Sequence, residues 1–136
     1  MIKIQSSKLK AQSFTNLFTF GGFVKKDKGR GKKLGFPTAN IAIPLDLPEG
    51  IFVCYTNHNK KKYPSLVFIG APLTFKEIDK KAEVYILDYS KEIYDEFLEV
   101  EVLKKLRDNM KFDSKEALVE QMKKDENEAR NFFQLK

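Results

Sequence analysis

Short segments in which apolar and polar residues alternate follow one another closely along this chain, and no long helical pattern separates them. The clearest segments are residues 51–56, 63–69, 82–89 and 97–106. Runs of this length and alternation are typical of β-strands. A parallel sheet needs a long crossover, usually a helix, between its strands. The pattern therefore disfavours a parallel α/β fold and predicts an all-β barrel or sandwich.

Residues 51–56 and 63–69 are predicted to pair as a hairpin, because only a polar stretch, residues 57–62, connects them. His58, the only histidine in the sequence, lies in that stretch and is expected to be a solvated turn residue. With no second histidine and no cysteine cluster, a histidine-based metal site has no basis. Cys54, the only cysteine, lies in an apolar run and is predicted to be a small buried side chain.

Alternation also assigns the faces of the later strands. In residues 82–89 it predicts one face made of Glu83, Tyr85, Leu87 and Tyr89. Nearer the N-terminus, the glycine pair Gly21-Gly22 is expected to interrupt the chain and to introduce a strand at Phe23-Val24.

The sequence period changes near the C-terminus. Apolar residues recur at helical spacing over residues 114–133, which predicts one amphipathic helix packed against the sheet. Asp113, followed three residues later by Glu116, has the pattern of a capping box at the start of this helix. Asp125 interrupts the apolar stripe, so we expect it to be a polar anchor between helix and sheet, paired with a cation.

A chain of 136 residues is long enough for a core of its own, so we expect a single domain over residues 1–136, with residues 1–19 least defined. The formal net charge of +6 favours anionic partners, either nucleotide phosphates or nucleic acid. No apolar run approaches the length of a membrane span, and the N-terminus has no signal-peptide pattern. We therefore expect a cytoplasmic protein, monomeric and not associated with a membrane.

Residues 29–40 combine three glycines, three cations and the tetrapeptide Pro37-Thr38-Ala39-Asn40. Closely spaced glycines let a backbone approach a ligand, and exposed amides flanked by cations suit phosphate oxygens. Thr38 and Asn40 are two positions apart, so in an extended chain their side chains point the same way. Such neutral oxygen ligands beside a phosphate suggest a partial Mg²⁺ site. The same residues also fit a basic surface turn whose polar side chains satisfy the backbone.

A phosphoryl-transfer enzyme also needs a group that orients or deprotonates the attacking hydroxyl. Glu83 lies at the start of an apolar strand, where burial could hold its carboxylate in place, and it is one candidate among several acidic residues. The standard nucleotide motifs do not fit. A P-loop would need glycine where Lys26 stands, and a dinucleotide fingerprint would need glycine where Leu34 stands.

Taken together and in order, the motifs resemble those of riboflavin kinases (flavokinases). The resemblance covers about residues 20–130. It is carried by Gly22-Phe23-Val24, Gly29-Arg30-Gly31, Leu34-Gly35-Phe36-Pro37-Thr38-Ala39-Asn40, Glu49-Gly50-Ile51-Phe52, Ile69-Gly70, Thr74-Phe75, Glu83, Leu87-Asp88, Tyr94, Leu106-Arg107, Phe112-Asp113-Ser114, Asp125 and Ala129.

The resemblance implies a six-stranded antiparallel Greek-key β-barrel with a C-terminal α-helix. It implies that the protein transfers the γ-phosphate of ATP, its co-substrate, to the 5′-hydroxyl of riboflavin, giving FMN and ADP. Thr38 and Asn40 would bind Mg²⁺, or Zn²⁺ or Mn²⁺ in its place, and Glu83 would be the catalytic base. The other site residues that the resemblance implies are Gly22, Gly29 and Lys33, with Thr38, at the nucleotide, and Arg107 and Phe112 at the flavin.

The chain departs from the family pattern at a few positions. Asp27 and Asp95 stand where glycine is usual, Leu73 where proline is common, and Lys32 where arginine is frequent. A carboxylate at position 27, beside a phosphate-binding loop, would be repulsive. The departures put substrate affinity in question but spare the implied metal ligands and base.

Two other interpretations of the sequence stay open. A small basic barrel with exposed aromatic residues could bind single-stranded nucleic acid, although this leaves Thr38, Asn40 and Glu83 unexplained. A flavin-binding regulator without catalytic activity is the other. In many bacteria the kinase module is the C-terminal half of a bifunctional FAD-synthesising enzyme, so we expect either a stand-alone kinase or a domain of such a protein.

Overall fold

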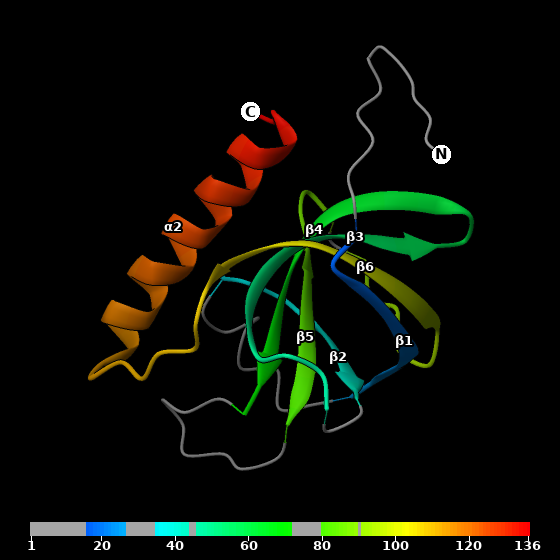
Figure 1. The fold of residues 1–136 in the computed structure, drawn as a ribbon, viewed down its shortest axis with the longest axis horizontal. Coiled ribbons are helices and arrows are strands. Elements are labelled where there is room, and N and C mark those ends of the chain that lie inside the picture. The colour runs from blue at the N-terminus through cyan, green and yellow to red at the C-terminus, as the bar shows by residue number, and fades with distance from the viewer. Residues whose placement is uncertain (1–15, 27–34, 44–45, 72–79, 90) are drawn as a thin grey trace.

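The computed structural model describes residues 16–26, 35–43, 46–71, 80–89 and 91–136, which form a closed barrel with one helix against it (Figure 1). The elements are β1 (Phe18–Lys25), β2 (Ala39–Ala42), β3 (Gly50–His58), β4 (Lys61–Gly70), β5 (Lys81–Ile86), β6 (Phe97–Arg107) and α2 (Lys115–Phe133). Around the barrel the strands follow the order β1-β2-β5-β4-β3-β6, and every neighbouring pair is antiparallel. The predicted six-stranded antiparallel barrel with a C-terminal helix is confirmed.

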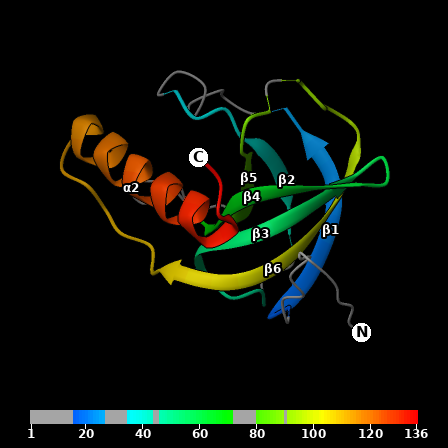
Figure 2. The ribbon, with the colours of Figure 1, turned by 90° about the horizontal axis from the view of Figure 1, so that it is seen from above.

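Apolar side chains form two cores on the two faces of the barrel wall. The interior core includes Val24, Ile41, Phe52, Cys54, Val67, Ala82, Val84 and Val100. The second core lies between the outer face and α2 and consists of Ile51, Val53, Leu66, Leu87, Leu103 and Ala129. Figure 2 shows α2 along one side of the barrel, with β1 on the far side. Cys54 is fully buried, as predicted, and burial raises the pKa of its thiol.

The predicted hairpin is present, with longer strands and a tighter turn than expected. β3 and β4 pair from Gly50 opposite Ile69 to His58 opposite Lys61. The two turn residues, Asn59 and Lys60, have φ values of 50° and 66°. Positive φ at both positions is the geometry of a type I′ turn, whose twist matches that of the flanking strands.

The prediction that His58 is a solvated turn residue is wrong. Because β3 extends through this position, His58 shares the inward face of Cys54 and is only 8% exposed. Its Nε2 lies 2.5 Å from Oε1 of Glu96. The imidazole is therefore a buried side chain in polar contact with Glu96.

β1 runs without interruption through Gly21 and Gly22, where the sequence predicted a break. A Cβ on Gly21 would lie 2.8 Å from Cζ of Phe97 on β6. A Cβ on Gly22 would lie 2.7 Å from Cγ2 of Ile41 on β2. The glycines thus admit side chains of the neighbouring strands rather than a turn.

β5 alternates as predicted over its length, with Ala82, Val84 and Ile86 buried and Glu83 and Tyr85 on the outer face. The predicted strand is too long, because the chain turns at residues 87–88. Asp88 has a φ of 58°, a conformation that aspartate tolerates better than most residues.

Helix α2 begins one residue later than the predicted capping box implies. Ser114, not Asp113, is the N-cap, and its hydroxyl accepts a hydrogen bond from the Ala117 amide at 3.1 Å. Serine in this role satisfies one of the amides that the first turn leaves unpaired.

In the described part of the chain, no helix combines the length and apolar character that crossing a membrane requires.

Asp125 is the predicted polar anchor between helix and barrel. It is 4% exposed, and its two carboxylate oxygens accept hydrogen bonds from Nε and Nη2 of Arg107 at 2.9 and 2.8 Å. Gln121 donates a third, at 3.0 Å. A two-point pairing of this kind fixes the angle as well as the distance between helix and strand.

Asp125→Ala should lower the free energy of unfolding by about 3 kcal/mol, because it leaves a largely buried guanidinium without its partner. Urea denaturation followed by circular dichroism measures this. The control is Glu128→Ala, an exposed position on the same helix, which should change stability by less than about 0.5 kcal/mol. Equal stability of the two variants would show that the ion pair does not fasten the helix.

Candidate active site

The strand registers place one residue from each strand in a single row across the outer face of the barrel. Each member of the row lies opposite the next in the paired strand, and the row is Lys25, Asn40, Glu83, Phe68, Ile51 and Arg107. The chain neighbours of Asn40 and Glu83 point inward, and Ile41, Ala82 and Val84 among them are buried. Asn40 and Glu83 therefore project together from the outer face.

Thr38, Asn40 and Glu83, proposed from the sequence as metal ligands and base, lie together in the structure. Directly opposite residues on antiparallel strands bring their Cβ atoms to about 5 Å, which is the relation of Asn40 to Glu83. Thr38 immediately precedes β2, and its hydroxyl donates a long hydrogen bond of 3.4 Å to Oε1 of Glu83. All three side chains are half-buried, so they are held in place and still accessible to a ligand.

The amide oxygen of Asn40 is buried and accepts no hydrogen bond within the described structure. A buried carbonyl oxygen without a partner costs about 1–3 kcal/mol, so most such atoms are paired. A neutral oxygen beside a hydroxyl and a carboxylate is the kind of ligand that hard divalent cations accept when phosphates supply the rest. The residues present therefore fit a divalent cation, which Asn40 and Thr38 would hold.

Two other carboxylates, Asp88 after β5 and Glu101 on β6, are engaged in structural contacts. Asp88 accepts hydrogen bonds of 2.7 and 3.2 Å from Arg130, which hold the pKa of its carboxyl below the usual value. Burial acts to raise the pKa of Glu101, but hydrogen bonds from Asn57 and Lys62 outweigh it, and the pKa is lowered. Both carboxylates are thus held by structural hydrogen bonds, whereas Glu83 lies beside Thr38 and Asn40.

Of the two residues predicted at the flavin, Arg107 is the last member of the row and Phe112 lies beside it. The guanidinium carbon of Arg107 is 5.9 Å from the ring centroid of Phe112, so the two side chains are neighbours. Nε and Nη2 of Arg107 are bound to Asp125. Arg107 is therefore held in one orientation by the helix and presents a fixed cation beside an aromatic ring.

The residues predicted at the nucleotide are only partly described. Gly22 lies in β1, packed against Ile41, and Lys25 of the same strand lies opposite Asn40. Gly29 and Lys33 lie outside the described residues, as do the departures Asp27, Lys32 and Leu73. The register of β1 and β2 also places Lys25 beside Asn40. No sequence motif had indicated this cation.

The departure at Asp95 has a local explanation. Its φ is 65°, a conformation that glycine adopts freely and that aspartate adopts more readily than most other residues. Its amide donates to the carbonyl of Val24 at 2.9 Å. The backbone at this position therefore keeps the shape that a glycine would give it.

Phe36 and Tyr85 adjoin the site, and neither was among the predicted site residues. Phe36 is 7% exposed, and its ring lies 5.6 Å from that of Tyr85, at an interplanar angle of 69°. The alternation of β5 had placed Tyr85 on the face of Glu83. A contact between that face and residue 36 depends on tertiary packing, which local patterns do not contain.

The family model and the similar curated proteins both indicate the riboflavin kinase family. The model of the flavokinase family, described as riboflavin kinase, matches residues 15–133. A bifunctional riboflavin kinase/FMN adenylyltransferase of Listeria monocytogenes is 38% identical over 119 residues, which are 85% of this chain and 38% of that protein. The chain spans less than half the length of this protein and of the other most similar curated relatives.

Two solved structures share the fold. A Streptococcus pneumoniae chain described as a macrolide-efflux protein is 36% identical, with a TM-score of 0.72 over 83% of this chain and 38% of that one. A riboflavin kinase from Trypanosoma brucei is 23% identical, with a TM-score of 0.58 over 85% of this chain and 79% of that one. At that identity the second match supports the fold alone.

Asn40→Ala should change the free energy of unfolding by less than about 1 kcal/mol in EDTA, since its amide oxygen makes no hydrogen bond to lose. Asn57→Ala is the matched control, because the Asn57 amide donates to Glu101 at 2.6 Å and its loss should destabilise by about 1–2 kcal/mol.

Adding Mg²⁺ with ADP should raise the melting temperature of the parent and of Asn57→Ala, but much less that of Asn40→Ala. Thermal unfolding with and without these ligands measures the difference. Equal stabilisation of all three proteins would remove Asn40 from the metal site.

Proposed function

This chain belongs to the riboflavin kinase family, and we propose that it transfers the γ-phosphate of ATP to the 5′-hydroxyl of riboflavin, giving FMN and ADP. The observation that carries the proposal is the pairing of Asn40 with Glu83, with the Thr38 hydroxyl beside both. A surface turn that merely satisfies its own backbone gives no reason for the buried amide oxygen of Asn40, opposite Glu83, to lack a hydrogen-bond partner.

Glu83 is the group that would act on the riboflavin hydroxyl. A primary alcohol is a poor nucleophile, and a carboxylate within hydrogen-bond reach orients it and accepts its proton. In the transfer, the hydroxyl oxygen bonds to the γ-phosphorus, the bond from that phosphorus to the bridging oxygen breaks, and ADP leaves. Because such transition states are loose and proton loss is late, orientation of the hydroxyl accounts for much of the role of Glu83.

Members of this family use ATP together with a divalent metal. We assign Mg²⁺ to this site, with Mn²⁺ or Zn²⁺ as possible replacements, and Thr38 and Asn40 as its protein ligands. The unpartnered oxygen of Asn40 supports the assignment. When bound, the cation neutralises charge on the phosphates. The Thr38 hydroxyl would then contact both the cation and Glu83, to which it donates a hydrogen bond.

The row of paired residues suggests how the two substrates lie. Lys25, opposite Asn40, would attract the phosphates, together with Gly22, Gly29, Lys33 and Thr38. Arg107 and Phe112, beyond the other side of Glu83, would adjoin the flavin. Glu83 lies between these two groups, which is where a base for hydroxyl-to-phosphate transfer is needed.

We propose further that residues 1–136 form a single kinase domain, active as a monomer in the cytoplasm, where ATP is available. Its partners would be riboflavin, FMN, ATP and ADP. Binding of single-stranded nucleic acid, the competing hypothesis, is less well supported, because it assigns no role to the Asn40–Glu83 pair.

Glu83→Gln keeps the shape of the side chain and removes its basicity, so turnover should fall by roughly 10²–10⁴-fold if Glu83 is the general base, while substrates still bind. Glu83→Asp, which withdraws the carboxylate by one methylene, should also be slow. FMN formation from riboflavin, Mg²⁺ and ATP measures both.

Glu99→Gln is the control, since Glu99 is an exposed carboxylate on β6, and it should leave turnover unchanged. FMN formation by Glu83→Gln at near the parent rate would contradict the assignment of the base. A parent protein that forms no FMN would contradict the proposed function itself.

A further inference from the structure

Tyr85 lies between the candidate active site and helix α2. It stands two positions after Glu83 on β5 and therefore on the same outer face of the barrel. Its ring is partly buried, and it packs against the core that the barrel shares with the helix. One side chain thus touches both the face that carries Glu83 and the element that covers the barrel.

On the site side, the ring of Tyr85 meets that of Phe36 edge to face, at 5.6 Å between centroids. Phe36 is 7% exposed and lies two residues before Thr38. The intervening residue is Pro37, whose ring fixes its φ angle. Because this connection is short and one of its φ angles is fixed, packing of the Phe36 ring restricts where Thr38 can lie relative to Glu83.

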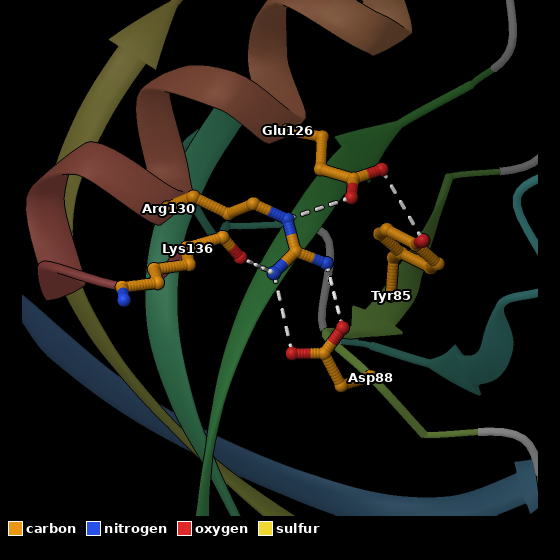
Figure 3. A network of polar contacts seen from close by, with 5 residues as sticks. All are labelled: Tyr85, Asp88, Glu126, Arg130 and Lys136. Carbon is orange, nitrogen blue, oxygen red and sulfur yellow. Dashed lines mark hydrogen bonds and ion pairs between the residues drawn. The ribbon is translucent and has the colours of Figure 1, made fainter.

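On the helix side, polar contacts join β5 and its following turn to α2 (Figure 3). The Tyr85 hydroxyl donates to Oε1 of Glu126 at 3.3 Å, and Oε2 of Glu126 accepts from Nε of Arg130 at 2.9 Å. Arg130 also binds both oxygens of Asp88, at 2.7 and 3.2 Å, and the Lys136 carbonyl at 3.0 Å. The hydroxyl end of Tyr85 is therefore tied to the helix.

We propose that Tyr85 is a positioning residue for the kinase reaction. Its ring holds Phe36, and so keeps Thr38 beside Glu83, while its hydroxyl and the Arg130 contacts keep β5 fixed against the helix. The proposal rests on the function proposed above. It gives α2 an indirect part in catalysis. The row of paired residues that carries Glu83 comes from the strands, and α2 would act on it through Tyr85.

A tyrosine that packs against the same helix on a different strand provides a matched control. Tyr55 is on β3, which β4 separates from β5, and its ring lies 5.2 Å from that of Phe133 on α2. Tyr55 and Tyr85 pack against the same core. Replacing either by leucine should lower the melting temperature to a similar extent, so stability alone does not separate them.

The catalytic readout does separate them. Tyr85→Leu should lower kcat by about tenfold to 10²-fold, because the Thr38 hydroxyl is no longer held in place. It should also weaken the binding of Mg²⁺ with ADP, measured by titration calorimetry. Tyr55→Leu should keep the parent kcat and affinity. Tyr85→Phe, which retains the ring, should recover most of the lost kcat.

A double-mutant cycle with Phe36→Leu tests the contact itself. Phe36→Leu alone should reduce kcat as Tyr85→Leu does, and the double variant should be no slower than either single variant, because both remove the same contact. If Tyr85→Leu does not fold, Phe36→Leu alone decides, and an unchanged kcat for that variant would overturn the proposal.

Equal kcat for Tyr85→Leu and Tyr55→Leu, or additive losses in the cycle, would likewise overturn it. These outcomes are distinct from failure of the proposed function, which an inactive parent protein would reveal.

Discussion

The pairing of β2 with β5 is the constraint on which the candidate active site depends. Its register sets Asn40 opposite Glu83. A slip of β2 by one residue would turn Asn40 into the interior and bring Ile41 out. Ile41 and Ala82 are both fully buried, so the register is held by the interior core. The packing that closes the barrel is therefore also what brings the proposed metal ligand and base together.

Helix α2 secures this arrangement from outside the barrel. Near its middle, Asp125 binds Arg107 at the end of β6, and five residues further on Arg130 binds Asp88 after β5. The first pair is largely buried, and such pairs specify geometry more than they add stability. The second is more exposed and contributes modestly. Together they fix the helix to β6 and to the turn after β5, the strands on either side of β3 and β4. Tyr85 on β5 is therefore held at a fixed position relative to the helix.

Local sequence patterns predicted an all-β barrel or sandwich, the hairpin and the C-terminal helix, because alternation and helical period are properties of single segments. The choice of a six-stranded barrel came from the family resemblance. Local patterns failed where a distant side chain decided the outcome. Gly21 indicated a break, but the close approach of Phe97 across β1 and β6 explains it. His58 looked like a turn residue until the length of β3 placed it inside. Thr38 and Asn40 were proposed as metal ligands from their spacing, and the family resemblance singled out Glu83 as the base. The role proposed for Tyr85 depends on how β5, residues 35–38 and α2 are placed together.

The proposed active site requires that Asn40, paired with Glu83, faces the metal. The most direct measurement replaces Mg²⁺ with paramagnetic Mn²⁺ in the presence of ADP and follows the side-chain amide resonances of asparagine by NMR. Asn57 is the internal reference, since it lies on β3, on the side of the barrel opposite β2. If Asn40 binds the metal, its signals should broaden beyond detection at Mn²⁺ levels that leave those of Asn57 visible. Persistence of the Asn40 signals at saturating Mn²⁺ and ADP would contradict metal binding by Asn40.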